Sequence, residues 1–117
     1  MLAEVAHQHG ARLFLDNTWG FGIFAPFENG VDVSIQALTK YPSGHSDVIA
    51  GAITVADQAS WHILRDASIQ LGPVAGPDEC WLTLRGLRTM GVRLAQQARS
   101  ALQVATWLKQ RPEVAQV

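Results

Sequence analysis

Apolar residues occur along the first half of the chain in short, almost uninterrupted runs that are typical of buried strands. Residues 13–15 and 31–38 form two such runs, and residues 48–55 form a third. Strands of this kind belong to parallel sheets whose two faces are covered by helices. The pattern therefore predicts an α/β fold with a mostly parallel sheet.

Apolar residues spaced for one face of a helix predict helices over residues 2–9, 58–71 and 77–110. Asp57 stands where an N-cap is needed, and we expect the helix that follows it to bury one apolar face. Residues 114–117 are apolar enough to begin a further strand. A β-rich part is thus followed by a helical part.

Composition excludes several classes of partner. The chain has 117 residues, a net charge of −1 and 16% charged residues, so nothing in its charge favours nucleic acid or an anionic membrane. No apolar run approaches the roughly 18 residues that span a bilayer. Cys80 is the single cysteine, which we expect to be buried, and it allows neither an intrachain disulfide nor a zinc set.

The start of the chain suggests a piece of a longer protein. It opens inside the first predicted helix with no capping residue before it, and it carries no basic flank of the kind a signal peptide has. We therefore expect an interior fragment of a cytoplasmic protein. Apolar residues make up 48% of the sequence, so part of this surface is expected to pack against something outside the chain.

Two polar residues stand where predicted strands end. Asp16 closes the first apolar run and Lys40 follows the second, so both should lie at one edge of a parallel sheet. A lysine there can attack a carbonyl, and a carboxylate beside it would keep a pyridine nitrogen protonated, as pyridoxal 5′-phosphate requires. The Thr39 hydroxyl is suited to a phosphate oxygen. A plain salt bridge between Asp16 and Lys40 is the alternative, and so is a solvated lysine.

Four segments resemble the Cys/Met-metabolism family of pyridoxal-phosphate enzymes: residues 16–19, 32–41, 44–47 and 85–89. The resemblance covers nearly the whole chain. It implies the fold of the aspartate-aminotransferase-like (fold type I) enzymes, with residues 1–117 forming an incomplete large cofactor-binding domain.

Within that domain, the resemblance implies a β-rich half at about residues 11–55 and a helical half at about residues 57–111. The upstream part of the domain and a C-terminal small domain would then lie outside the chain. We expect the fragment alone to bind the cofactor weakly and not to turn over substrate.

The resemblance also implies roles for individual residues. Lys40 would bind the cofactor covalently and, once freed, move the substrate Cα proton. Asp16 would pair with the pyridine nitrogen, Thr39 would contact the phosphate, and Thr18 would belong to the same cofactor site. Ala37 stands where many relatives have a serine that reaches the phosphate, so that contact is lost or made by a backbone N–H.

Residues 18–19 and 34–37 are most similar to the cystathionine β-lyase branch of the family. That branch implies elimination of cystathionine to homocysteine, pyruvate and ammonia in methionine biosynthesis, by a homotetramer. Three alternatives stay open. They are a γ-synthase or γ-lyase, a non-catalytic truncated product that docks on intact subunits, and an aldolase that uses Lys40 without a cofactor.

Other candidate residues have simpler interpretations. We expect His45 to hold the turn at residues 44–47 by hydrogen bonds, and Asp47 to be a turn or capping residue. Tyr41 should pack against a strand. For Trp19, core packing or a subunit contact is favoured over a place at the substrate entrance.

Two pairs of basic residues are close enough in sequence to be candidate ligand sites. Arg85 and Arg88 lie three apart on one helix face, where ion pairs or a subunit contact are favoured over an anion site. His7 and His9 would bind a metal only with further ligands, and the sequence supplies none nearby.

Overall fold

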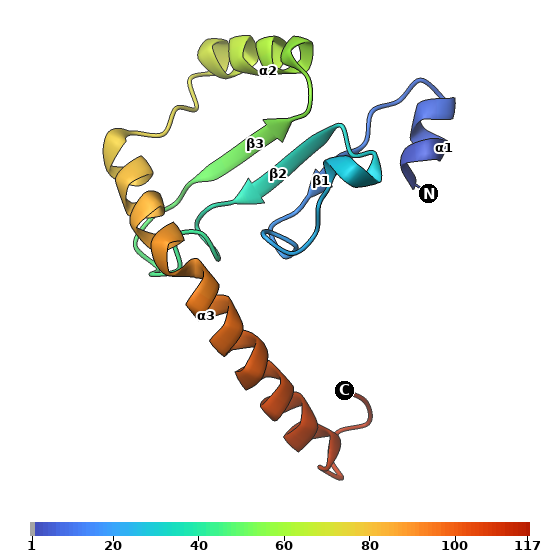
Figure 1. The fold of residues 1–117 in the computed structure, drawn as a ribbon, viewed down its shortest axis with the longest axis vertical. Coiled ribbons are helices and arrows are strands. Elements are labelled where there is room, and N and C mark those ends of the chain that lie inside the picture. The colour runs from blue at the N-terminus through green and yellow to red at the C-terminus, as the bar shows by residue number, and fades with distance from the viewer. Residues whose placement is uncertain (1) are drawn as a thin grey trace.

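The computed structural model describes residues 2–117, in which a three-stranded sheet is flanked by helices (Figure 1). The strands are β1 (Phe14–Asp16), β2 (Val33–Ala37) and β3 (Gly51–Val55), and they lie side by side in that order. All three predicted strands are present, although each is shorter than or shifted from the apolar run that predicted it. The α/β class is confirmed.

The sheet is mixed. β1 and β2 are parallel, with Phe14 opposite Val33, whereas β2 and β3 are antiparallel, with Ala37 opposite Gly51. The third strand therefore departs from the mostly parallel arrangement expected from the sequence. The connection over residues 38–50 is consequently a hairpin loop, and it lies at the edge of the sheet where β1 also ends.

The helices lie close to their predicted positions. They are α1 (Leu2–Gln8), α2 (Gln58–Leu71) and α3 (Pro77–Lys109), with a short 3-10 turn, η1 (Phe27–Asn29), before β2. Asp57 caps α2 as predicted, and its carboxylate accepts a hydrogen bond from the Ser60 N–H at 2.8 Å. The strand expected at residues 114–117 is absent from the structure, which places these residues in irregular conformation.

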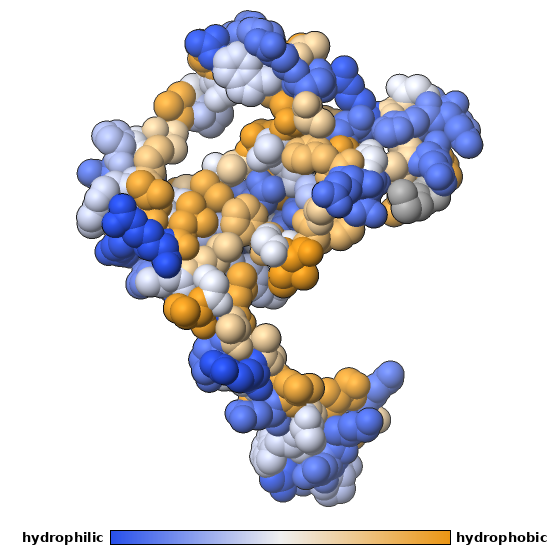
Figure 2. All heavy atoms as spheres, viewed as in Figure 1, coloured by the Kyte–Doolittle hydropathy of each residue, from blue (hydrophilic) through white to orange (hydrophobic). Residues whose placement is uncertain are grey.

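The buried core is small and centres on β2. Its apolar members are Ala3, Val31, Val33 and Val48. The chain exposes 8709 Å² of surface, whereas a folded monomer of its mass exposes roughly 6,200 Å². Its radius of gyration is 17.9 Å, against roughly 13 Å for a compact domain of this length. Large apolar areas on and beside the sheet are therefore uncovered (Figure 2).

Two burial predictions, for the α2 face and for Cys80, are wrong for this reason. Trp61 and Leu71, on the α2 face expected to be buried, are 48% and 81% exposed. Cys80 is exposed. Trp19 is 82% exposed, which rules out core packing, and the subunit contact expected as the other possibility stays a prediction. The described residues 2–117 cover these side chains only in part, so much of their apolar surface faces no other part of the described chain.

α3 meets the loop after β2 through its N-terminal half and then runs away from it. Gly86 lies against the loop after β2, and a Cβ at this position would meet the Ser43 carbonyl oxygen at 2.1 Å. Only a residue without a side chain permits this approach. Beyond this contact α3 runs away from the sheet toward the C-terminus (Figure 1). None of the helices at residues 2–117 combines the length and apolar character that a membrane crossing needs.

Candidate active site

A cavity of about 740 Å³ opens at the edge of the sheet where β1 and β2 end. The loops after β1 and β2 line it together with α3, which brings three separate parts of the chain to one place. Its volume is within the range of small-molecule sites in proteins. The lining residues that the chemistry below uses are Thr18, Trp19, Thr39, Lys40, Tyr41 and Arg93.

Lys40 stands in the first turn of the loop that follows β2. Its N–H donates to the Ala37 carbonyl at 3.1 Å, and its own carbonyl accepts from the Gly44 N–H at 2.9 Å. Two backbone hydrogen bonds thus hold the residue, while its side chain is exposed and lines the cavity. This is the arrangement that a nucleophilic amine needs, because the backbone is fixed and the amine is accessible.

Asp16 is the last residue of β1 and lies at the same edge of the sheet as Lys40. Hydrogen bonding from the Thr18 side chain, and then from the Thr18 N–H at 3.0 Å, lowers the pKa of this carboxyl below its ordinary value. Asp16 is therefore a carboxylate at neutral pH. The prediction that the two residues share one edge is confirmed.

Thr18 joins the ends of the two parallel strands. Its side chain is buried, and its Oγ1 accepts a hydrogen bond from the Ala37 N–H at 2.8 Å. This amide was the backbone donor that could have replaced the missing serine hydroxyl at a phosphate. Because Thr18 already accepts from it, that replacement is not offered by the structure. A direct cofactor contact by Thr18 stays a prediction.

The Thr39 hydroxyl is hydrogen-bonded to the backbone of Ala50, the residue before β3. It accepts from the Ala50 N–H at 3.0 Å and donates to the Ala50 carbonyl at 3.2 Å. A hydroxyl has one proton to donate, so a bond to a phosphate oxygen would require that proton to leave the carbonyl. The predicted phosphate contact of Thr39 therefore stays a prediction.

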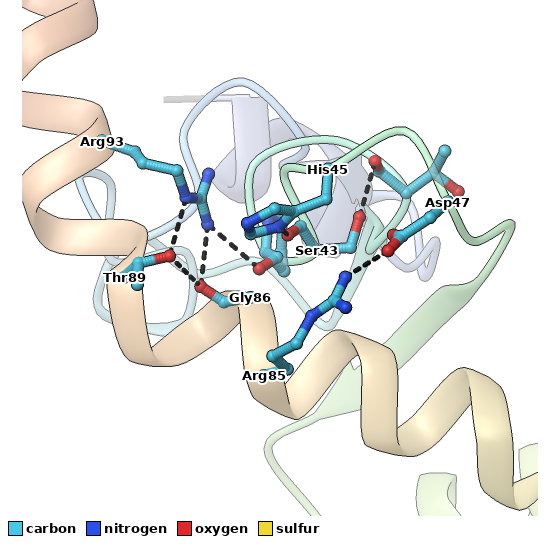
Figure 3. Close-up of polar contacts among 9 residues, drawn as sticks. Ser43, His45, Asp47, Arg85, Gly86, Thr89 and Arg93 are labelled. Carbon is cyan, nitrogen blue, oxygen red and sulfur yellow. Dashed lines mark hydrogen bonds and ion pairs between the residues drawn. The ribbon is translucent and has the colours of Figure 1, made fainter.

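Two side chains brace the loop that carries Lys40. His45 Nδ1 donates to the Ser43 carbonyl at 2.5 Å, in agreement with the predicted role in holding this turn. Asp47 pairs with Arg85 of α3 (Figure 3). Asp47 therefore joins the loop to a distant helix, where we expected a turn or capping role. The expectation of an ion pair for Arg85 is confirmed, and Arg88 is exposed on the same helix.

Two aromatic rings form one wall of the cavity. The Trp19 and Tyr41 rings meet edge to face, with centroids 6.0 Å apart. Tyr41 thus packs against Trp19, in place of the predicted strand contact. Because Trp19 is exposed and lines the cavity, its position agrees with a place at the substrate entrance, the less favoured of its predicted roles.

Arg93 is the residue that sequence reasoning missed. Its guanidinium reaches from α3 to the carbonyl oxygens of Tyr41 and Pro42, immediately after Lys40 in the chain. In the sequence it is one more arginine on a long helix, and nothing in its spacing singles it out. Only the packing of α3 on the loop makes it part of the site.

The histidines at the other end of the molecule take no part in this site. His7 Nε2 lies 2.9 Å from an Asp32 carboxylate oxygen, and His9 Nδ1 bonds the Val5 carbonyl. No group of three or more His, Cys, Asp or Glu side chains that could hold a metal ion occurs in the part of the chain described here.

The sequence matches the family of Cys/Met metabolism PLP-dependent enzymes over residues 1–117. This match covers the strand ends, the Lys40 loop and α3 together. The chain belongs to that family. Its cofactor is pyridoxal 5′-phosphate (PLP), and members are enzymes. The family-level expectation drawn from the four sequence segments is thereby confirmed.

Individual relatives are similar over nearly the whole chain. A cystathionine beta-lyase of Bordetella avium is 48% identical over 114 residues, which are 97% of this chain and 29% of the relative. A cystathionine beta-lyase of Escherichia coli is 45% identical over 108 residues, 92% of this chain and 27% of the relative. The chain therefore spans less than a third of these proteins.

Solved structures confirm the fold. The crystal structure of a cystathionine gamma-lyase from Lactobacillus plantarum, in complex with L-serine, matches 95% of this chain and 29% of its own with a TM-score of 0.91. Its sequence is 29% identical to this chain. A protein named a gamma-lyase thus shares this arrangement of strands and helices, whereas the similarity to proteins named beta-lyases is one of sequence.

Proposed function

We propose that this chain is an interior part of the large PLP-binding domain of a carbon–sulfur lyase. The reaction would be β-elimination of cystathionine to homocysteine, pyruvate and ammonia. The observation that carries the proposal is the placement of Asp16 and Lys40 at one sheet edge, with Lys40 lining a cavity of about 740 Å³. An ionised carboxylate and an accessible amine are the two groups that a pyridine aldehyde requires.

The residues present fit the cofactor. Lys40 would bind it through the side-chain amine, and Asp16, held ionised by Thr18, would keep a positive charge on the pyridine nitrogen. Bound there, PLP supplies an electron sink for negative charge at the substrate Cα. The Lys40 amine, once released by substrate, would move the Cα proton, because it lines the same cavity.

Thr18 and Thr39 have supporting parts in this proposal. Thr18 holds the loop after β1 to the end of β2, and this fixes the carboxylate of Asp16. Thr39 would contact the phosphate once its proton turns from the Ala50 carbonyl to the ligand. Both contacts with the cofactor are part of the proposal.

The domain assignment is also a proposal. We assign the β-rich half to about residues 11–55 and the helical half to about residues 57–111, with the rest of the domain and a small domain outside the chain. It is supported by the uncovered apolar surface, by the extended shape, and by the relatives being more than three times as long. We also propose that the full-length protein is a cytoplasmic homotetramer that acts in methionine biosynthesis. This part of the proposal is supported by the family resemblance alone.

Reduction of the protein with borohydride tests the cofactor site. We expect full-length protein incubated with PLP and then reduced to carry the pyridoxyl group on Lys40, located by peptide mass mapping. Lys40→Ala should abolish this modification. Label on another lysine, or equal labelling of the variant, would contradict the proposal. Labelling that requires a carbonyl substrate but no PLP would favour the aldolase alternative.

The product identifies the reaction. The full-length protein should release pyruvate from cystathionine, whereas a γ-eliminating enzyme would release 2-oxobutyrate. The chain is more similar in sequence to these proteins named beta-lyases than to a probable gamma-synthase or to the gamma-lyase of known structure, and this favours pyruvate as the product. Release of 2-oxobutyrate alone would place the protein in the γ branch.

A non-catalytic role has one observation in its favour, namely the amount of exposed apolar surface. Trp19, Trp61, Trp81 and Trp107 are all at least 48% exposed. A truncated chain of this kind would bind to intact subunits through such residues. Sedimentation of the 117-residue chain tests this non-catalytic role, because a stable monomer would argue against docking on intact subunits.

A further inference from the structure

Arg93 forms four hydrogen bonds beside the Lys40 loop. Its Nη2 donates to the carbonyl oxygens of Tyr41 at 2.9 Å and Pro42 at 3.3 Å, and to that of Gly86 at 2.8 Å. Its Nε donates to Thr89 Oγ1 at 3.0 Å. Figure 3 shows the guanidinium between α3 and the loop. One side chain thus joins two turns of a helix to two consecutive loop carbonyls.

The loop is shaped to receive this guanidinium. Gly44 faces it with a φ of +68°, and a Cβ at this position would lie 2.0 Å from Arg93 Nη1. Any other residue at 44 would therefore meet the arginine and strain the backbone. Pro42, whose carbonyl accepts from Arg93, has a fixed φ and lends the turn further rigidity.

The hydrogen bonds of Arg93 are made with the residues that fix the position of the Lys40 backbone. Tyr41 and Pro42 follow Lys40 directly, and the Lys40 carbonyl is itself bonded to the Gly44 N–H. Arg93 also lines the cavity with Lys40. A planar fork with several donors can hold two carbonyls and a helix at once, which a lysine ammonium does less well.

We propose that Arg93 is a positioning residue for Lys40, holding the loop so that the amine reaches the carbonyl carbon of the cofactor. This inference rests on the proposed function, because it assumes that Lys40 binds PLP. Arg93 acts through the backbone of Tyr41 and Pro42 and does not itself react. Its loss should slow the formation of the lysine–cofactor bond more than it lowers the stability of the fold.

The test uses the full-length protein freed of cofactor. PLP is added, and the return of the absorption band of the lysine-bound cofactor is timed for wild type, Arg93→Met and Arg93→Lys. The control is Arg99→Met, on the same helix, whose side chain donates a hydrogen bond to the neighbouring Gln96 at 2.9 Å. Two further readouts are the pH midpoint of the absorption band and the thermal unfolding of each cofactor-free protein.

We expect Arg93→Met to regain the band on the order of tenfold more slowly, because a small displacement of a reacting group is costly in rate. Arg93→Lys should fall between Arg93→Met and wild type, and Arg99→Met should match wild type. The pH midpoint should shift only in the Arg93 variants, and the unfolding temperatures of all cofactor-free proteins should stay within a few degrees.

Return of the band at the wild-type rate in Arg93→Met would overturn the inference. So would failure of cofactor-free Arg93→Lys to fold, since Arg93 would then stabilise the whole fold and not the lysine in particular. A wild-type protein that forms no band at all would instead refute the proposed function. The two failures are thus distinguishable.

Discussion

Gly86 of α3 lies so close to Ser43 that a methyl group on its Cα would stand 2.1 Å from the Ser43 carbonyl oxygen. The helix therefore reaches the loop after β2 through its backbone. This contact lies between the Arg85–Asp47 ion pair and the Arg93 hydrogen bonds along the helix. Three successive attachments thus fix the loop that carries Lys40.

Gly86→Ala should lower stability by about 1–3 kcal/mol, because the added methyl overpacks a closed contact. The helix or the loop must move to accommodate it, so PLP binding should weaken as well. Thermal unfolding of the full-length protein and a PLP titration measure the two effects.

Gly91→Ala is the matched control, since nothing lies within 4 Å of a Cβ at that position. In an exposed helix interior this change should raise stability by about 0.5–1 kcal/mol. Equal effects of the two substitutions would show that the Gly86 contact is not close in solution.

Thr18→Val should destabilise the protein by about 1–3 kcal/mol, because it leaves the partly buried Ala37 N–H without its acceptor. The substitution keeps the shape of the side chain, so lost packing contributes little. Thr18→Ser keeps the hydroxyl and should retain most of the stability. Thermal unfolding and the affinity for PLP should fall together in Thr18→Val and not in Thr18→Ser.

The Arg85–Asp47 ion pair should contribute only modestly to the free energy of unfolding. Both side chains are partly exposed, at 40% and 34%, so solvent screens their attraction. A double-mutant cycle with Arg85→Gln and Asp47→Asn should give a coupling of about 0.2–1 kcal/mol. The coupling should shrink in 1 M salt, and a value unchanged by salt would contradict a screened ion pair.

Asp32 should make stability depend on acid pH. The hydrogen bond with His7, and then that from the Leu13 N–H at 2.7 Å, lower the pKa of this carboxyl from its ordinary 3.8. A lowered folded-state pKa contributes stability that is complete above the unfolded value and is lost as pH falls toward the folded one. Urea-induced unfolding measured below pH 4 should therefore show a loss of stability, and this loss should be smaller in Asp32→Asn than in wild type.

At pH 7 Asp32→Asn should itself be less stable than wild type, by about 1 kcal/mol, because neutral acceptors form weaker hydrogen bonds than carboxylates. Glu28→Gln, another acid ahead of β2, serves as the control and should leave the acid dependence as in wild type. Identical pH curves for wild type and Asp32→Asn would show that the pair with His7 and Leu13 does not persist in solution.

The elements and the placement of Asp16 and Lys40 could be predicted from sequence because they depend on local patterns. Apolar runs and helical spacing are properties of neighbouring residues, and two parallel strands bring their ends to one edge by geometry alone. Asp57 as a helix cap has the same local origin. These features need no knowledge of what else packs on the chain.

Features that depend on distant packing could not be predicted. The antiparallel direction of β3 follows from how residues 38–50 turn, and a run of apolar residues carries no information about direction. Arg93 belongs to the site only because α3 packs on a loop some fifty residues earlier. Cys80 and Trp61 have the composition of buried residues, and whether they are covered depends on surfaces beyond the described residues.

α3 is one continuous helix of 33 residues whose attachments to the sheet region end near Arg93. From there to Lys109 it extends about 24 Å as a stiff rod. The far end of the rod, around the half-exposed Trp107, therefore lies well away from the Lys40 loop, and its direction is set by the attachments at residues 85, 86 and 93.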